Sequence, residues 1–424
     1  MPSADGSPFA PSETRAGTAP VRQWPDAGSS RIPNWVYTDP ELFAREQQRI
    51  FAGESWLYVC LEAELAQPGA FKRARLGAKE VVAVRDAAGA IGVLVNRCAH
   101  RSAQFCSAAR GLVQEFVCPY HQWTYDLGGK LIGVPFRRGF RGQGGMPEDF
   151  HLGEHGLESL AVTCRHGVVF ASFSNATEPF ADYLGGTMLG YFDRVFDGRE
   201  LVVLGYLRQR IPSNWKLMFE NIKDPYHASL LHVFLVTFGL FRLDQQSSIE
   251  MDPTGRHAVL VSSKGEQREN DATRQMRAFK SNFALNDPRL LDPVREFPGA
   301  ATVVMQTLWP NLIVQQQSNT LATRQIVPID AGRFDLAWTF FGYADDTPEM
   351  RQRRLRQANL MGPAGLVSLD DSEAMLLSQA GIGGDEEALC VAEMGGRAVR
   401  DEPHMVTETA IRGFYRYYRR VMEL

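Results

Sequence analysis

The chain has 424 residues, of which 44% are hydrophobic and 22% charged, and its formal net charge is −4. This composition is typical of a folded globular protein of two or three domains and excludes a mainly disordered, collagen-like or coiled-coil chain. The sequence has no block of basic residues, so we do not expect nucleic-acid binding. It also has no apolar run near the ~20 residues of a membrane span, so we do not expect membrane insertion. The N-terminus lacks the apolar core of a secretory signal, and six cysteines are too few for a disulfide framework in so long a chain. We therefore expect a reducing, cytoplasmic setting.

The first half of the chain is expected to form a small all-β domain. Residues 1–30 are rich in Pro, Ser, Ala and Gly, which predicts a flexible arm. Residues 31–53 are expected to pack on the second domain and to include a helix over 40–51, after a start signal at Thr38-Asp39. Within residues 54–173, short β-type runs occur at 56–60, 80–85, 91–96, 116–118, 130–134 and 167–173.

Residues 174–424 are expected to form a second, α+β domain. Residues 214–241 have helical spacing with two interruptions, and 347–361 and 407–422 read as strong helices. Strands of one mostly antiparallel sheet are expected at 201–211, 258–263, 301–308, 312–317, 323–328 and 333–343. The fold class is thus α+β, an all-β domain followed by a sheet-and-helix domain.

Two Cys-His pairs mark the first domain as a metal-binding domain. Cys98 and His100 are followed by Cys118 and His121, and each pair falls where a strand gives way to a loop. A structural zinc ion could use two Cys and two His. A two-iron, two-sulfur cluster could instead take the cysteines on one iron and the histidines on the other. Because each loop supplies one ligand of each kind, the pattern favours the iron–sulfur cluster; buried Cys and His without metal are the third alternative.

A second group of candidate ligands lies in residues 214–241. His227 and His232, with Asp224 nearby, are typical of the two-histidine, one-carboxylate site of non-heme ferrous iron. Five residues apart, the two histidines would point ~140° apart on a regular helix, so they can share an ion only if the helix is distorted or breaks. Asp224 before Pro225 also fits a helix N-cap, and the histidines fit ordinary polar packing.

A carboxylate from elsewhere must complete such a site. The segment from Gly362 to Glu373 offers three acids at the start of a helix, Asp370, Asp371 and Glu373. The same acids could simply be first-turn residues that the helix dipole favours. The spacing alone leaves the choice open.

These motifs resemble those of the large (α) subunits of Rieske non-heme iron aromatic-ring-hydroxylating oxygenases. The two Cys-His pairs, Cys98 with His100 and Cys118 with His121, resemble the Rieske motif. The stretch from Asn214 to His232 resembles the mononuclear-iron motif. Gly362-Pro363-Ala364-Gly365 resembles the start of the segment that carries the third iron ligand, and the resemblance assigns that role to Asp371. The likeness runs from about Trp24 to the C-terminus. It is greatest to subunits acting on benzoate-type acids, above all the salicylate 5-hydroxylase group, and also to anthranilate and terephthalate dioxygenases.

The resemblance implies a Rieske [2Fe-2S] domain and a helix-grip-like catalytic domain with Fe²⁺. It implies electrons from a ferredoxin or ferredoxin reductase, with NADH acting only through that separate reductase. It also implies a trimer of large subunits, as α3 or with a small β subunit as α3β3, in which the cluster of one subunit faces the iron of its neighbour. Asp224 is then the residue that bridges the two centres.

The implied reaction is O₂-dependent hydroxylation of a monocyclic aromatic acid, with salicylate expected as substrate and gentisate as product. An anthranilate- or terephthalate-type dioxygenase, a Rieske monooxygenase of a non-aromatic amine and a pure electron carrier are the alternatives. The expected substrate contacts are Asn221 and Ile222 by family position, Gln316 on a polar strand, Ser368 near Asp371, and Arg324 as a partner of a carboxylate. Sheet-surface or structural hydrogen bonding is the competing role for the last three.

Two positions depart from the family pattern. Ser102 stands where the Rieske motif usually has Gly, which is harmless only if the backbone there does not need a positive φ. Val367 stands where naphthalene-type relatives carry a bulky aromatic residue, so the pocket is expected to differ in shape from theirs.

Overall fold

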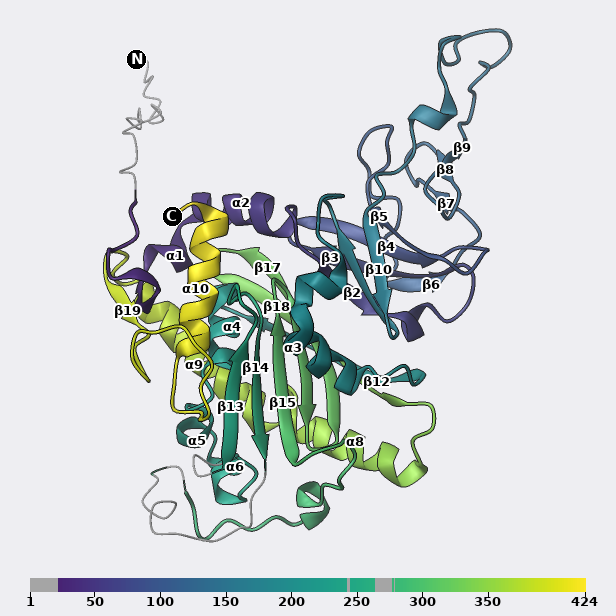
Figure 1. Ribbon diagram of the computed structural model, residues 1–424. Helices are drawn as coiled ribbons and strands as arrows, with labels where there is room; N and C mark the ends of the chain where they lie inside the picture. Colours follow the sequence, from purple (N-terminus) through teal and green to yellow (C-terminus); the bar gives the residue numbers. More distant parts are fainter. Residues whose placement is uncertain (1–21, 242–244, 264–276, 278) are drawn as a thin grey trace, which may run out of the picture.

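The computed structural model describes residues 22–241, 245–263, 277 and 279–424. In Figure 1 a β-domain lies at the upper right and a larger α+β domain fills the centre. Each domain contains elements beyond those expected. None of the described helices is long and apolar enough to cross a membrane.

The β-domain consists of three small antiparallel sheets, in the strand orders β5-β4-β3-β6, β7-β8-β9 and β10-β11-β2. Strands at the six expected places are joined by four others, β3, β6, β8 and β10, which are charged, exposed or only two residues long and so show no strand pattern in the sequence. The strands are β2 (Leu57–Leu61), β3 (Ala70–Leu76), β4 (Lys79–Arg85), β5 (Ile91–Val95), β6 (Arg110–Leu112), β7 (Phe116–Val117), β8 (Thr124–Tyr125), β9 (Leu131–Gly133), β10 (Ala161–Arg165) and β11 (Val168–Ser172).

The second domain is built on one seven-stranded antiparallel sheet, in the order β12-β18-β17-β16-β15-β14-β13. Six of its strands lie where apolar runs were visible in the sequence. The seventh, β13, was not expected, because its sequence QSSIEM is mostly polar. The strands are β12 (Leu201–Ile211), β13 (Gln246–Met251), β14 (Ala258–Ser263), β15 (Ala301–Leu308), β16 (Leu312–Gln317), β17 (Thr320–Asp330) and β18 (Arg333–Tyr343).

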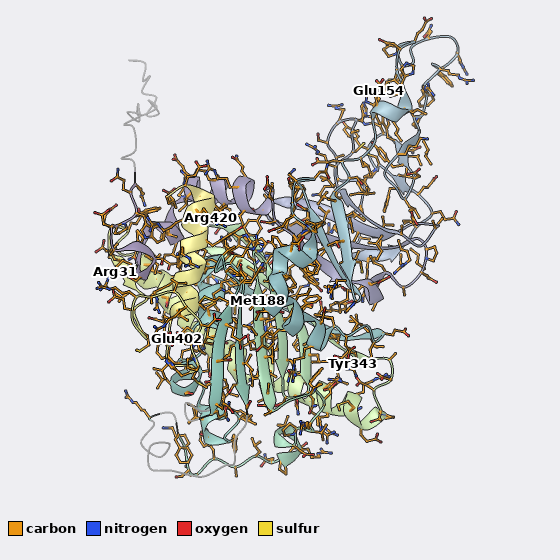
Figure 2. The ribbon with its side chains drawn as sticks, viewed as in Figure 1. Arg31, Glu154, Met188, Tyr343, Glu402 and Arg420 are labelled. Carbon is orange, nitrogen blue, oxygen red and sulfur yellow. The ribbon has the colours of Figure 1, made fainter. Side chains whose placement is uncertain are left out.

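Helices cover both faces of this sheet. On one face lies α3 (Phe180–Val195), which is kinked at Gly185 and whose Met188 carbonyl accepts a 2.6 Å hydrogen bond from Gln306 (Figure 2). Tyr58 of β2 reaches the same face and contacts Thr323 at 2.9 Å, so the β-domain is anchored to the sheet. The helices associated with the other face and the edges are α4 (Trp215–Lys223), α5 (Ala228–Leu231), α6 (Val233–Thr237), α8 (Pro348–Met361), α9 (Leu366–Ile382) and α10 (Thr409–Met422).

The N-terminal segment packs on the second domain. Asp39 accepts hydrogen bonds from two backbone amides and caps α2 (Pro40–Glu46), which continues as a π-helical turn over Gln47–Phe51. Before it come α1 (Trp35–Thr38) and β1 (Arg31–Pro33), which pairs with β19 (Leu389–Val391).

Part of the expected arm is packed against this core. Trp24 is buried and lies 5.7 Å from the Tyr415 ring of α10, so residues 22–30 are not a free arm. The remainder of the expected arm, residues 1–21, lies outside the described residues.

Candidate functional site

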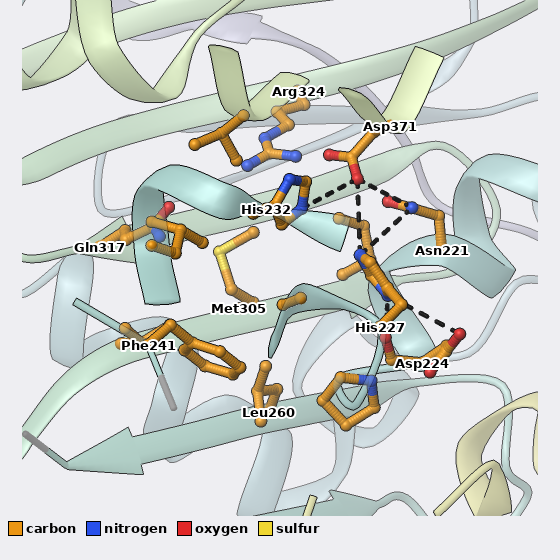
Figure 3. Close-up of a pocket in the computed structure, with 16 residues that line it drawn as sticks. Asn221, Asp224, His227, His232, Phe241, Leu260, Met305, Gln317, Arg324 and Asp371 are labelled. Atoms are coloured by element: carbon orange, nitrogen blue, oxygen red, sulfur yellow. Dashed lines mark hydrogen bonds and ion pairs between the residues drawn. The ribbon is translucent and has the colours of Figure 1, made fainter. Parts of the chain in front are cut away.

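Three candidate ligands converge between α4, α9 and the sheet. The carboxylate Oδ1 of Asp371 lies 3.4 Å from Nε2 of His227 and 3.2 Å from Nε2 of His232. One ligand atom from each residue lies within 4.8 Å of the other two, the only group of this kind found among the described residues. Figure 3 shows these side chains together with Asn221, whose amide donates a 3.1 Å hydrogen bond to Asp371.

The chain brings the two histidines together by breaking the helix between them. His227 lies just before α5, and His232 has the non-helical angles φ −84° and ψ 88° between α5 and α6. The distortion expected from their spacing is therefore present. Asp371 comes from α9, which begins at Leu366, so this acid is not in the first turn of the helix.

Asp224 follows the end of α4 and is no N-cap in this structure. Its Oδ2 lies 3.7 Å from Nδ1 of His227, and its backbone carbonyl also accepts a hydrogen bond from that nitrogen. A contact at Nδ1 leaves Nε2 of His227 directed at Asp371, as a metal-binding imidazole requires. On the other side, Asp370 lies 3.3 Å from Nδ1 of His232.

The carboxylates dominate the electrostatics of the site. Burial lowers the pKa of His227, but hydrogen bonds to Asp224 and Asp371 outweigh it and raise the pKa to about 10. Burial raises the pKa of Asp371, whereas its contacts to both histidines bring it far below the usual value. Two imidazoles and a carboxylate in a negatively charged setting fit Fe²⁺, which accepts this mixed nitrogen and oxygen donor set.

A small cavity opens beside these three residues. Ile222, Asn221, Val367 and Arg324 line it, as does Gln317, which the sequence did not single out. In Figure 3 an apolar wall faces the polar group; its residues include Leu235, Phe241, Leu260, Val303 and Met305. An apolar cavity with a few placed polar groups is typical of a small-molecule site.

Two expected substrate contacts do not line this cavity. Gln316 points to the opposite face of the sheet, where its Oε1 accepts a 3.1 Å hydrogen bond from Arg194 of α3. The register pairs Gln317 with Val303, so the odd-numbered side chains of β16 share the cavity face and Gln317 takes the place expected for Gln316. Ser368 is turned away and donates a 3.0 Å hydrogen bond to Gln209. Alternation revealed the strand but not which face meets the cavity.

The other four candidate ligands lie in two loops of the β-domain, Cys98 and His100 in one, Cys118 and His121 in the other. The two loops have the same backbone hydrogen bond. The amide of Ser102 donates to the carbonyl of Cys98, and the amide of Gln122 donates to that of Cys118, at 3.0 and 2.9 Å. Both cysteines are buried. Burial raises the pKa of the Cys98 thiol, a hydrogen bond with Tyr125 opposes the rise, and the nearby Cys118 adds to it.

The two histidines of these loops also lie together. The rings of His100 and His121 are 4.5 Å apart, and His100 stacks on Trp123. Nδ1 of His100 is buried and has no hydrogen-bond partner among the described residues, so it is available to a metal. Two thiols and two imidazoles, supplied in pairs by two similar loops, fit a Rieske-type [2Fe-2S] cluster.

Comparison with known proteins identifies both domains. Residues 198–424 match the family "Ring hydroxylating alpha subunit (catalytic domain)", and residues 55–143 match the "Rieske [2Fe-2S] domain". The large oxygenase component of salicylate 5-hydroxylase from Ralstonia sp. is 52% identical over 94% of this chain and 96% of its own length. The anthranilate 1,2-dioxygenase large subunit of Burkholderia cepacia is 44% identical over 94% and 95%.

The fold is also that of a solved oxygenase. Naphthalene 1,2-dioxygenase from Rhodococcus sp., bound to indole, superposes with a TM-score of 0.78 over 92% of this chain and 94% of its own. At 22% identity this likeness concerns the arrangement of the two domains and their sheets.

Proposed function

Because the chain belongs to the family of ring-hydroxylating oxygenase α subunits and carries a Rieske domain, we propose that it hydroxylates a monocyclic aromatic acid. Salicylate is the first candidate substrate and gentisate the product. The similarity to the salicylate 5-hydroxylase component over nearly the whole chain supports this choice. Val367 on the cavity wall gives the pocket a shape different from that of naphthalene-type relatives, which carry a bulky aromatic residue at this position.

Arg324 is the observation that carries the substrate class. Its side chain is buried in the cavity wall and forms no ion pair with a carboxylate of the described residues. Burial lowers its pKa to about 9, with only a partial opposing effect from Asp371. Because an unpaired buried guanidinium is unfavourable, a bound carboxylate that forms a bidentate contact would compensate its charge. The same cation repels a quaternary amine, which argues against the amine-oxidising alternative.

The chain's own residues then divide the work as follows. His227, His232 and Asp371 hold Fe²⁺, while Cys98, Cys118, His100 and His121 hold the cluster. When bound, the iron supplies O₂ binding and activation, and the cluster supplies single electrons. Arg324 fixes the acid, Asn221 and Ile222 border the ring, and Asp224 holds the imidazole of His227 in orientation. The apolar wall excludes bulk water from the reacting ring.

The electron path is proposed to cross between subunits. In Figure 1 β7, next to the ligand Cys118, lies at the upper right, whereas α5 and α6, which flank His232, lie at the lower left. A neighbour's cluster would shorten this path if subunits contact head to tail, and such contacts close into rings. We infer a ring of at least three large subunits, accompanied by a small β subunit and served by a ferredoxin or reductase.

Product analysis tests the proposal. The purified oxygenase, with a reductase shown to reduce its cluster, is given salicylate, anthranilate, terephthalate or a quaternary amine, and oxygen uptake is followed with product identification. Gentisate from salicylate is expected. Turnover of anthranilate or terephthalate alone would keep the aromatic-acid class and discard salicylate. Turnover of only the amine would overturn the proposal.

A further inference from the structure

Arg324 is held by two neutral partners, one at an edge and one at a face of its guanidinium. The Oε1 atom of Gln315 accepts hydrogen bonds from Nε, at 2.7 Å, and from Nη2. The ring of Trp338 lies 4.0 Å from the guanidinium carbon. Nη1 makes no hydrogen bond to any residue within the described ranges, so the cation retains donor capacity at the cavity.

Gln315 is fixed in one orientation by a second hydrogen bond. Its side chain is fully buried, and its Nε2 donates to Oε1 of Gln317 at 3.0 Å. A guanidinium has only donors, so it requires the amide oxygen and leaves the amide nitrogen for Gln317. An amide binds the guanidinium without neutralising it, whereas a carboxylate at the same place would do both.

The surface on which Arg324 rests is tied to the helix that carries Asp371. The indole of Trp338 donates a 3.2 Å hydrogen bond to Gln209, which also accepts one from Ser368 of α9. In return Gln209 donates to Ser372, the residue next to Asp371, at 3.0 Å. A buried network that satisfies its polar groups holds its members rigidly. Arg324 and the carboxylate ligand are thus fixed by one connected set of side chains.

We propose that Gln315 is a positioning residue that determines substrate charge: as a neutral acceptor, it orients Arg324 and leaves the guanidinium charge available to a substrate carboxylate. This inference rests on the proposed function and names the residue that makes the pocket selective for acids. Ser368, Gln209 and Trp338 support the same guanidinium from the other side.

The substitution Gln315→Glu tests this directly, because it changes shape little and places a negative charge against Arg324. The introduced carboxylate then pairs with Arg324 in place of the substrate carboxylate. Salicylate affinity should fall about 10- to 100-fold, the range expected for losing a hydrogen bond to a charged group. The affinity of methyl salicylate, which has no charge, should stay within about twofold. The acid-to-ester ratio, the affinity for salicylate divided by that for methyl salicylate, therefore separates the charge effect from any general loss of binding.

Gln316→Glu is the matched control. Gln316 is the next residue along the same strand, and it also accepts a hydrogen bond from an arginine, Arg194, but on the face away from the cavity. This variant makes the same chemical change one residue away. Its acid-to-ester ratio should equal that of the unaltered protein.

Binding is measured by titration calorimetry on the full, metal-loaded protein without reductant or O₂. A ratio in Gln315→Glu equal to that in Gln316→Glu would overturn the inference. If Gln315→Glu does not fold, Gln315→Met removes the acceptor without adding charge. It should weaken salicylate about tenfold but not the ester, and an unchanged ratio there would also overturn the inference. If the unaltered protein binds no aromatic acid at all, the proposed function itself fails, which is a distinguishable result.

Discussion

Ser102 and Gln122 occupy equivalent places in the two ligand loops, and both have positive φ angles, 59° and 55°. Each follows a histidine ligand by one or two residues and turns the chain back so that its amide reaches the cysteine carbonyl. The left-handed region is unfavourable for residues with a Cβ atom. The Gly that the motif usually has at this position therefore allows the positive φ angle without strain, whereas Ser102 adopts it with local strain.

Ser102→Gly should accordingly stabilise the Rieske domain by about 0.5–1 kcal/mol, since relief of strain exceeds the added chain entropy. The measurement is the temperature at which the visible absorbance of the cluster is lost. Gln122→Gly should act in the same direction. Ala99→Gly, in the same loop but without a positive φ, should lower that temperature, and a rise there would contradict the explanation.

Asp224 contacts His227 from outside the three-ligand group, so we expect it to serve electron transfer rather than iron binding. Asp224→Asn should keep the cluster reducible and the iron content unchanged, while turnover falls by orders of magnitude. Iron analysis, rapid-mixing reduction of the cluster and product formation are measured on the same preparation. Loss of the mononuclear iron in this variant would make Asp224 a ligand instead.

Glu220 is a partly buried acid of α4, next to Asn221, whose pKa is raised to about 7, chiefly by desolvation, although hydrogen bonds from Tyr415 and Tyr37 oppose the rise. Its folded pKa exceeds the unfolded one, near 4.5. The stabilising contribution of the protonated form is therefore complete below pH 4.5 and is lost as pH rises through about 7.

Glu220→Gln should remove this dependence, because the amide cannot ionise. Relative to the unaltered protein, its Tm should change little at pH 5 and rise at pH 8, by an amount equivalent to at most about 3 kcal/mol. Thermal unfolding followed by circular dichroism at both pH values provides the comparison. An equal difference at the two pH values would rule out titration of Glu220 in this range.

At the scale of elements, the long strands and terminal helices were predictable because burial gives them clear periodicity. The helix α3 was missed, since Gly185, Gly186 and Gly190 interrupt its pattern, and β3 was missed because its sequence AFKRARL is strongly charged. The ligands were predictable from their spacing and motif. Gln317, Gln315 and Trp338 were not, because strand alternation does not reveal which face meets a cavity and hydrogen bonds between strands leave no local signal.

The start of α9 sets the position of Asp371. A Cβ atom on Gly365, directly before the helix, would lie 1.9 Å from the Leu360 carbonyl oxygen, so only glycine allows this close approach to α8. Gly365→Ala should displace α9, destabilise the domain by about 1–3 kcal/mol and reduce the mononuclear iron content, with the cluster absorbance unchanged.

Gly381→Ala is the control within the same helix. A Cβ atom there meets nothing within 4 Å, so alanine should be tolerated and even add about 0.5–1 kcal/mol of stability. Iron content is determined by elemental analysis alongside thermal unfolding. Full iron occupancy in Gly365→Ala would show that α9 does not depend on this contact.

At the scale of the whole molecule, the two metal sites lie in separate domains that one chain holds apart (Figure 1). The anchoring of β2 on the sheet, through the contact between Tyr58 and Thr323, fixes the β-domain on the face opposite the cavity. In the proposed electron path, the cluster of one subunit passes electrons to the iron of a neighbouring subunit. The oligomer is therefore part of the proposed mechanism and not only of the architecture.

The central claim is that this chain inserts oxygen from O₂ into a ring bound through its carboxylate. The most direct test is mass spectrometry of the product formed from salicylate under ¹⁸O₂, with the oxygenase reduced by its electron donor. The proposed mechanism predicts gentisate that carries one ¹⁸O atom and is formed far more slowly by Arg324→Met. Unlabelled gentisate, or no hydroxylated salicylate while the cluster is reduced and a quaternary amine is consumed, would contradict it.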